Sequence, residues 1–291
     1  MENPYCSEEE AARYTCLRSR SPIVVDGRLD EEDWRLAVKS PRFVDVVSGG
    51  RGIYDTRAAA LWDQEALYIG FWVEEPCIEA HLTERDALIF NENDVEVFID
   101  GGDTYYELEM NALGTIYEVF FIWQDAYQRG GKYKVPQFDL LSGRVLSFGG
   151  NNDRSAKHFW WGTHPRKCRW AFLDWDFPGL RSAVQVDGKL NDCSLPHKGW
   201  TVELAFPWAG MEWLADGRTL PPDDGDMWRI FFGRYNTFNL GGKEQTAGWA
   251  WNRVGNVDNH APHCFTQVYF SNQFVDEPAE AARNMATALS E

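Results

Sequence analysis

The chain has 291 residues and a formal net charge of −17, from 45 acidic and 28 basic residues. This charge would repel a phosphate backbone or an anionic membrane, and no cluster of Lys and Arg offsets it, so we expect neither nucleic acid nor membrane as a partner. Hydrophobic residues at 44% and charged residues at 25% are typical of a soluble globular protein. Aromatic residues at 15% suit both β-sandwich cores and sugar-binding surfaces.

The six cysteines are scattered along the chain, and none forms a C-x-x-C pair. This argues against a zinc knuckle or a dithiol redox site and leaves disulfide pairing open. The first residues contain no basic segment and no apolar run, and no stretch reaches the length of a transmembrane helix. We therefore expect a cytoplasmic location.

The start of the chain predicts little regular structure. Residues 1–21 read as a polar N-terminal extension with one short helix at residues 8–14. A short strand at residues 23–25 and a turn follow. Asp30 then precedes a short helix that places Trp34 on its buried side.

The sequence is organised around the stretch from residue 93 to 119. Apolar and polar side chains alternate here in two successive strands that are joined by a Gly-Gly-Asp turn. The alternation places Glu96, Glu107 and Glu109 together on the face turned away from the packed core. Acids gathered on one patch repel each other, so this face requires a cation, a basic partner or a ligand rich in hydroxyl groups.

Further strands are predicted on both sides of this stretch. They fall at residues 58–62, 67–73, 170–175, 180–186, 199–208, 226–236 and 266–270. Between about 123 and 195 the pattern loosens into a long loop excursion, and residues 274–291 form a tail with a short Ala-rich helix. Together these features predict an all-β fold, a single antiparallel β-sandwich domain at residues 22–273 with short terminal helices.

Several short motifs occur in an order that is similar to a known family. They are Val25-Asp26-Gly27 with Leu29-Asp30 and Trp34, Leu61-Trp62-Asp63 with Leu67-Tyr68-Ile69-Gly70, Asn93 to Asp100, Gly199 to Glu203 with Pro207-Trp208, Trp228-Arg229-Ile230, and Trp249-Ala250-Trp251 with His260, Pro262 and Phe265. Over residues 22–270 the chain resembles the family 9-like carbohydrate-binding modules, a DOMON-related group.

The resemblance implies a single jelly-roll or immunoglobulin-like β-sandwich that binds reducing ends or short oligosaccharides, with calcium bound in some members. It also implies that two Trp rings clamp the sugar while polar side chains of the concave sheet hold its hydroxyl groups. Glu96 falls at one polar position, and Glu109 stands where the founding members have arginine. Phe90 lies close to one clamp position, and the other falls near Asn259-His260; neither position is Trp.

Aromatic and basic residues complete the set of expected ligand contacts. Trp160 and Trp161 lie in the loop excursion, where core packing explains them poorly. Trp249 and Trp251 share a face if their segment is extended, with core packing as the alternative. Arg229 and Arg234 lie five apart on one strand, so one should reach the acids; the alternative is a structural ion pair.

A metal site is predicted only for calcium. Hard oxygen ligands are available at Asp26, Asp30, Asp100 and Asp103, although no EF-hand loop is present and turn formation also explains these residues. His158, His164, His260 and His263 show no spacing typical of a transition-metal site.

Three functions remain open at this stage. The first is binding of a mono- or oligosaccharide on the acidic and aromatic concave face, in carbohydrate catabolism. The second is glycoside hydrolysis by a carboxylate pair drawn from Glu96, Glu107, Glu109 and Glu203. The third is a DOMON-like haem or interaction module. Haem needs an axial His or Met in the cleft, and alternation turns Met110 away from the acidic face, which argues against this function. The oligomeric state stays open.

Overall fold

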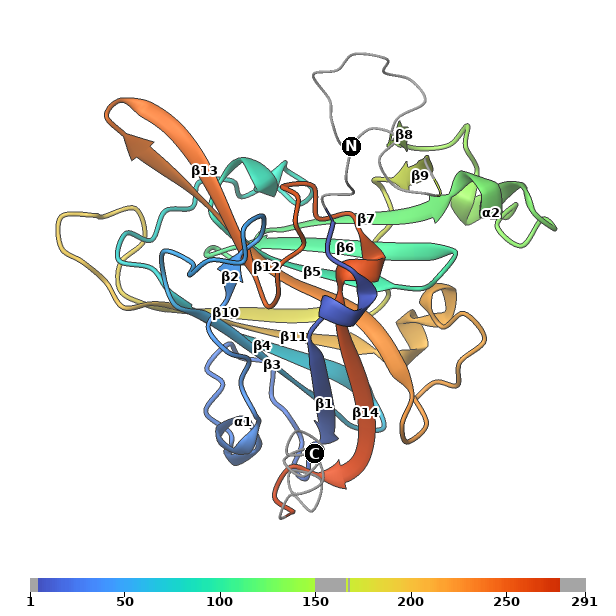
Figure 1. Ribbon diagram of the computed structural model, residues 1–291, viewed down its shortest axis with the longest axis horizontal. Coiled ribbons are helices and arrows are strands. Elements are labelled where there is room, and N and C mark those ends of the chain that lie inside the picture. Colours follow the sequence, from blue (N-terminus) through green and yellow to red (C-terminus); the bar gives the residue numbers. More distant parts are fainter. Residues whose placement is uncertain (1–4, 150–165, 167, 278–291) are drawn as a thin grey trace.

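The computed structural model describes residues 5–149, 166 and 168–277, and within them 14 strands form one continuous sheet (Figure 1). The strands are β1 (Arg13–Arg18), β2 (Val44–Asp45), β3 (Thr56–Trp62), β4 (Ala66–Glu74), β5 (Asp94–Asp100), β6 (Thr104–Asn111), β7 (Ile116–Trp123), β8 (Val145–Phe148), β9 (Arg169–Phe172), β10 (Arg181–Asp187), β11 (Gly199–Pro207), β12 (Met227–Leu240), β13 (Lys243–Ala250) and β14 (Thr266–Phe274). The α-helices are short: α1 (Glu32–Leu36) and α2 (Gln124–Gln128).

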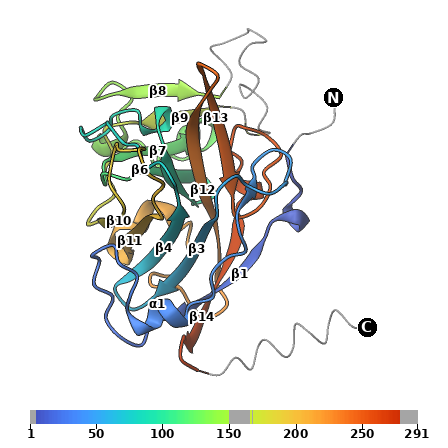
Figure 2. The ribbon, with the colours of Figure 1, turned by 90° about the vertical axis from the view of Figure 1, so that its left-hand side faces the viewer.

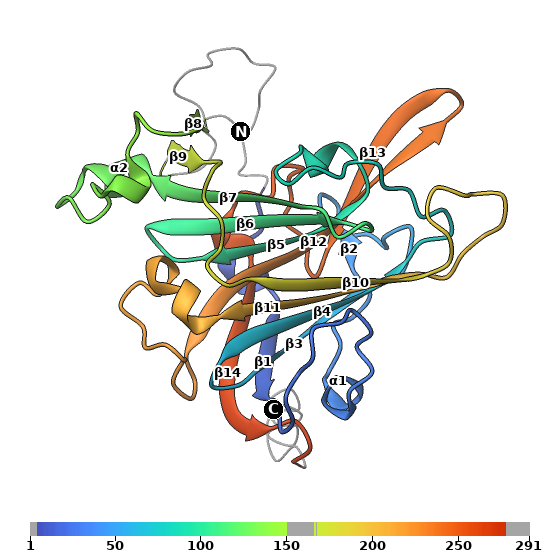
Figure 3. The same cartoon turned by 180° about the vertical axis from the view of Figure 1, so that it is seen from behind.

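The strand order is β10-β11-β4-β3-β1-β14-β12-β5-β6-β7-β9-β8, with β13 and β2 attached beside β12. The sheet folds back on itself, so that aromatic side chains of its two halves meet in a common core. Phe71 on β4 lies 6.3 Å from Phe232 on β12, and Tyr106 on β6 lies 6.1 Å from Phe206 on β11, between ring centroids. Figure 3 shows β10, β11, β4 and β3 in succession, and Figure 2 shows the long β12–β13 hairpin. The predicted all-β sandwich is confirmed.

Strand β1 makes this sheet mixed. It pairs in parallel with β14 on one side and with β3 on the other, whereas the other strand pairs in the described part are antiparallel. Tyr14 and Cys16 point into the core, while Arg13 and Thr15 are exposed. The helix expected at residues 8–14 is therefore wrong: a single 3-10 turn at Glu8–Glu10 precedes β1.

Alternation predicted the faces of the central strands correctly. Val95, Val97 and Ile99 are fully buried in the core, as are Leu108 and Met110 on the neighbouring strand. The hairpin β3–β4 and the short helix α1, with Trp34 buried, also lie where the sequence places them. The expected strand at residues 23–25 does not form, and β2, β8 and β13 were not expected.

The loop excursion contributes to both ends of the sheet. Strands β9 and β8 extend the sheet beyond β7, and β10 pairs with β11 at the opposite end. Trp160 and Trp161, together with His158 and His164, lie outside the described residues. The tail that was expected to form a helix also lies outside the described residues from residue 278 onward. Its described part is a turn that follows β14.

One disulfide joins two loops at the end of β4 and of β10. Cys77 and Cys193 are bonded, with their Cα atoms 4.9 Å apart, and 116 positions separate them in the sequence. The other cysteines in the described range, Cys6, Cys16, Cys168 and Cys264, are buried free thiols. Among the described helices, none is both long and apolar enough to cross a lipid bilayer.

Candidate functional site

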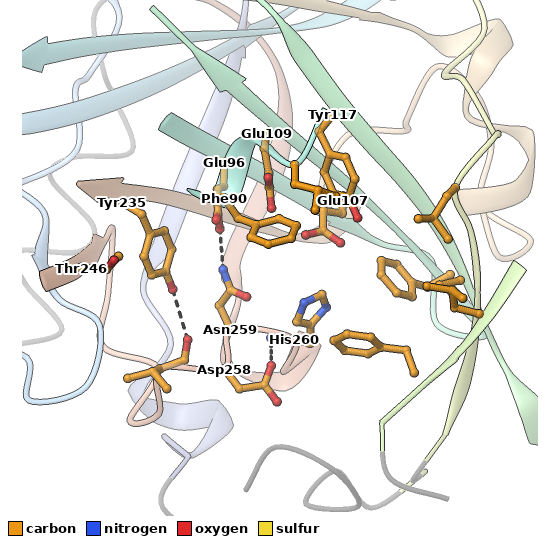
Figure 4. Close-up of a pocket in the computed structure, with 17 residues that line it drawn as sticks. Phe90, Glu96, Glu107, Glu109, Tyr117, Tyr235, Thr246, Asp258, Asn259 and His260 are labelled. Atoms are coloured by element: carbon orange, nitrogen blue, oxygen red, sulfur yellow. Dashed lines mark hydrogen bonds between the residues drawn. The ribbon is translucent and has the colours of Figure 1, made fainter. Parts of the chain in front are cut away.

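A cavity of about 590 Å³ opens on the outer face of β5, β6 and β7, the face turned away from the sandwich core. The carboxyl groups of Glu96, Glu107 and Glu109 point into it from the floor (Figure 4). Residues of β7, β8 and β9 form one side, and the segment 257–260 lies across from the floor. The predicted grouping of the three glutamates is thus observed.

The register of the strands explains this grouping. Glu96 on β5 is directly opposite Glu109 on β6, and Phe98 is opposite Glu107, so all four side chains share one face. The exposed fractions are 3% for Glu96, 5% for Glu107 and 2% for Glu109. These acids are therefore not a solvated outer surface but the buried floor of a cavity.

Burial raises the pKa of all three glutamates, because a charged carboxylate loses its hydration. The pKa of Glu107 rises to about 8. The pKa values of Glu96 and Glu109 rise well above their usual value, first through burial and then through the charges of the neighbouring carboxylates. Burial therefore favours the protonated, neutral form of each carboxyl group.

Aromatic rings form the wall of the cavity. Phe90, 45% exposed at the cavity edge, packs edge-on against Tyr117 at 5.7 Å between centroids. Phe121 and Phe148 continue the wall on β7 and β8, 5.7 Å apart. Tyr235 lines the other side, where Gly248 leaves room: a Cβ at Gly248 would lie 2.3 Å from the Tyr235 ring.

The segment 257–260 supplies polar groups opposite the floor. The Asn259 side-chain amide donates a hydrogen bond to Oε2 of Glu96. Asp258 accepts a hydrogen bond from the backbone N–H of His260 at 3.1 Å and one from the Tyr5 hydroxyl at 3.2 Å. These contacts tie the loop to the floor and to the N-terminal segment.

His260 is held as a neutral ring. Its Nδ1 lies 3.0 Å from the Tyr105 hydroxyl, and its ring lies 4.7 Å from that of Phe148. Burial, followed by the positive charge of Arg169, lowers the pKa of His260 well below its usual value. The ring therefore offers hydrogen bonding and an aromatic face but no positive charge to balance the glutamates.

Five of the residues expected to contact a ligand lie along this cavity: Phe90, Glu96, Glu107, Glu109 and His260. Sequence reasoning did not single out Tyr117, Tyr235 or Asp258 as contacts, and it named Asn259 only as lying near a clamp position. Tyr117 could have been found, because alternation on a third strand places it beside Glu109. The others depend on how distant segments pack, and no local pattern marks them.

Neither expected arginine reaches the acidic floor. Arg234 is paired in register with Val95, so it points to the opposite face, where it forms a buried ion pair with Glu75 at 3.3 Å. Arg229 forms an ion pair with Glu8 near the N-terminal turn. The alternative interpretation, structural ion pairs, is the correct one for both.

For Trp249 and Trp251, core packing is the correct interpretation, and sugar stacking is wrong. Their exposed fractions are 1% and 6%, and both belong to the core. The indole N–H of Trp249 donates to the Thr56 hydroxyl at 3.1 Å. The ring of Trp251 packs against Phe232 at 4.8 Å.

Glu203 is a structural residue rather than a member of the site. It is fully buried beside α1, where one carboxyl oxygen accepts the backbone N–H groups of Asp26 and Gly27 at 2.9 and 3.0 Å. The other oxygen accepts the indole N–H of Trp34 at 2.8 Å. A glycosidase pair cannot include it.

Within the described part of the chain, no three of the four expected calcium ligands meet at one point. Asp26 lies 3.7 Å from Arg28, and Asp30 is exposed. Asp100 accepts the backbone N–H of Gly102 at 3.0 Å within its turn. Asp103 pairs with two arginines, Arg129 and Arg166.

Comparisons with known proteins point to the fold. No protein-family model matches the sequence, and no curated protein sequence matches it. A structure of a proposed carbohydrate-binding protein from Bacteroides uniformis matches with a TM-score of 0.58 and 13% identity, covering 90% of this chain and 100% of that one. The chain therefore shares the β-sandwich fold of that structure.

Two carbohydrate-binding modules of family 9 from Caldicellulosiruptor kristjanssonii also match, one in complex with cellotriose and one with glucose. Their TM-scores are 0.47 and 0.46, and their identities are 12% and 11%. The matches cover 92% and 91% of this chain, and 96% and 99% of the modules.

Proposed function

We propose that this chain binds a mono- or short oligosaccharide in the cavity above β5, β6 and β7. The observation that carries the proposal is the combination, in one cavity, of an aromatic wall with a floor of hydrogen-bonding carboxyl groups. Aromatic faces contact the C–H faces of a sugar ring, and polar groups opposite them hold its hydroxyl groups.

The protonation of the floor suits a neutral polyol. A protonated carboxyl group donates one hydrogen bond and accepts others, as a sugar hydroxyl does. Because burial favours the neutral form of Glu96, Glu107 and Glu109, the floor can exchange hydrogen bonds in both directions. Asn259, beside Glu96, adds an amide with the same dual character.

Two further considerations support binding. The sequence resembles family 9-like carbohydrate-binding modules over residues 22–270, and the similar structure from Bacteroides uniformis belongs to a proposed carbohydrate-binding protein. Hydrolysis is less well supported, because a glycosidase pairs one protonated carboxyl with one ionised carboxylate, and burial raises the pKa of all three glutamates. Met110 packs in the core, so it cannot serve as an axial haem ligand in this cavity.

Isothermal titration with a panel of neutral mono- and oligosaccharides tests the proposal, in buffer containing a chelator. We expect heat from at least one sugar and no release of product. Phe90→Ala should weaken binding about tenfold, since it removes the exposed edge of the wall. Leu195→Ala, at an exposed residue outside the cavity, is the matched control and should bind as the unmodified protein does.

The absence of heat with every sugar of the panel would reject the proposal. So would binding that Phe90→Ala and Glu96→Gln both leave unchanged, because the sugar would then lie elsewhere. Product release from aryl glycosides that Glu96→Gln abolishes would replace binding by hydrolysis as the function.

A further inference from the structure

The carboxyl groups of Glu96 and Glu109, which line the cavity floor, converge with that of Asp94, which is not part of the lining. Asp94 and Glu96 point to the same side of β5, and Glu109 lies directly opposite Glu96 on β6. One carboxylate oxygen from each of the three can be chosen such that all three lie within 4.8 Å of one another. Each of the three residues is more than nine-tenths buried.

The hydrogen bonds in this cluster leave oxygens without partners. Oδ1 of Asp94 accepts the backbone N–H of Tyr235 at 3.1 Å, and Glu96 accepts the amide of Asn259. Oδ2 of Asp94 and Oε2 of Glu109 have no hydrogen-bond partner. Buried oxygens of this kind are normally paired, because an unpaired one loses its hydration with nothing in return.

Basic side chains do not fill this gap. Among the ion pairs of the described residues, none involves Asp94, Glu96 or Glu109. Arg234 on the neighbouring strand β12 is directed to the opposite face and bound to Glu75, and burial raises the pKa of Asp94 more than the charge of Arg234 lowers it. Three buried acids that meet within a few ångströms can either keep protons or exchange them for a cation from outside the chain, and the unpaired oxygens of Asp94 and Glu109 are available to such a cation.

We propose that Asp94, Glu96 and Glu109 bind one divalent cation of the oxygen-preferring class, represented by Ca²⁺. Carboxylate oxygens are the ligands that this class of ion selects, and the cluster contains no thiolate or imidazole that would favour a softer metal. Glu96 and Glu109 also line the cavity, so the ion reaches the cluster through it. This site is distinct from the aspartates that the sequence suggested, and it does not depend on saccharide binding.

The test is isothermal titration of CaCl₂ into the full chain after exhaustive dialysis against EDTA and then metal-free buffer at neutral pH. We expect binding of about one Ca²⁺ per chain, and a rise in the thermal unfolding midpoint when Ca²⁺ is added. The variants Asp94→Asn and Glu109→Gln should each weaken Ca²⁺ binding at least tenfold, because each removes a charged ligand.

Asp30→Asn is the matched control, since Asp30 is an exposed carboxylate elsewhere that the sequence offered as a calcium ligand. It should bind Ca²⁺ as the unmodified chain does. Thermal unfolding of all variants in EDTA verifies that they fold. Asp94→Asn and Glu109→Gln replace repelling acids by amides, so they should not lower the thermal unfolding midpoint.

Two results would overturn the site. One is no binding of Ca²⁺, Mg²⁺ or Mn²⁺ to the unmodified chain up to about 10 mM, which is about ten times the dissociation constant of the weakest protein calcium sites. The other is Ca²⁺ binding that persists undiminished in both Asp94→Asn and Glu109→Gln. Sugar titrations in EDTA are a separate experiment, so failure of the cation site and failure of saccharide binding are distinguishable.

Discussion

Glu96 and Glu109 face each other across the β5–β6 ladder, and both carboxyl groups are buried without a basic side chain to balance them. In a protein of net charge −17, two such groups are expensive to bring together. They do not stabilise the sandwich by forming ion pairs, so their arrangement indicates a ligand-binding role for the cavity.

The first prediction concerns the energetic role of Glu109. In metal-free buffer, Glu109→Gln should leave the free energy of unfolding unchanged or raise it by about 1 kcal/mol, because it removes a buried, repelled acid. Leu108→Ala, the neighbouring residue that points into the core, should lower it by about 3 kcal/mol. Urea unfolding in EDTA measures both. A loss in Glu109→Gln as large as in Leu108→Ala would mean that this carboxyl group holds the fold together.

The second prediction is a pH dependence centred on Glu118. This residue lies on the core face of β7, contacts the hydroxyl of Tyr106 and the guanidinium of Arg85, and burial raises its pKa to about 7. The folded protein thus keeps a proton that the unfolded chain releases above its ordinary pKa of 4.5. The resulting stability is complete below that value and is lost as the pH rises to about 7.

Glu118→Gln cannot titrate, so it should remove this part of the pH dependence. Between about pH 5 and 7, the free energy of unfolding should fall less steeply in the variant, by about 1.4 kcal/mol per pH unit. Urea unfolding across this range gives the slopes. Parallel slopes would show that Arg85 keeps Glu118 ionised throughout.

A third prediction separates structure from function at Glu203. Glu203→Ala should lower the free energy of unfolding by about 3 kcal/mol, since it leaves the buried donors of Gly27 and Trp34 without an acceptor. Glu244→Ala, at an exposed residue of β13, should change it little. Sugar affinity should be the same in both folded variants. A specific loss of affinity in Glu203→Ala would return this residue to the site.

The fourth prediction concerns the Cys77–Cys193 bond. Peptide mapping without reductant should recover these two cysteines in one linked fragment, while the four other cysteines react as thiols after unfolding. Replacing both by Ala should lower the free energy of unfolding by about 2 to 4 kcal/mol, because the bond closes a long loop. Recovery of six free thiols from protein purified without reductant would contradict the pairing.

The acidic floor could be predicted because it depends on one local rule. Alternation along two adjacent strands assigns Glu96, Glu107 and Glu109 to one face whatever the rest of the chain does. The same rule gave the opposite-face relation of Arg229 and Arg234, but it could not say what covers each face. Both faces of this part of the sheet are covered, one by the other half of the sandwich and one by segment 257–260.

The contacts that sequence reasoning missed arise from segments far apart in the chain. Asn259 meets Glu96 across 163 positions, and no local pattern signals such a meeting. Trp249 and Trp251 were ambiguous because an indole ring suits a core and a sugar surface equally. Strand β1 carried a usable signal, since Tyr14 and Cys16 alternate with Arg13 and Thr15, but the acidic run before it favoured a helix.

The position of β1 has a practical consequence for protein production. A shortened version designed from the family-like motifs would begin near residue 22 and would omit the segment that bridges β3 and β14. One edge of each of those two strands would then be exposed. Its unpaired backbone N–H and C=O groups could pair with a strand of another molecule. Poor solubility of such a fragment would reflect a missing piece of the sheet, and affinity measured on it would say little about the cavity.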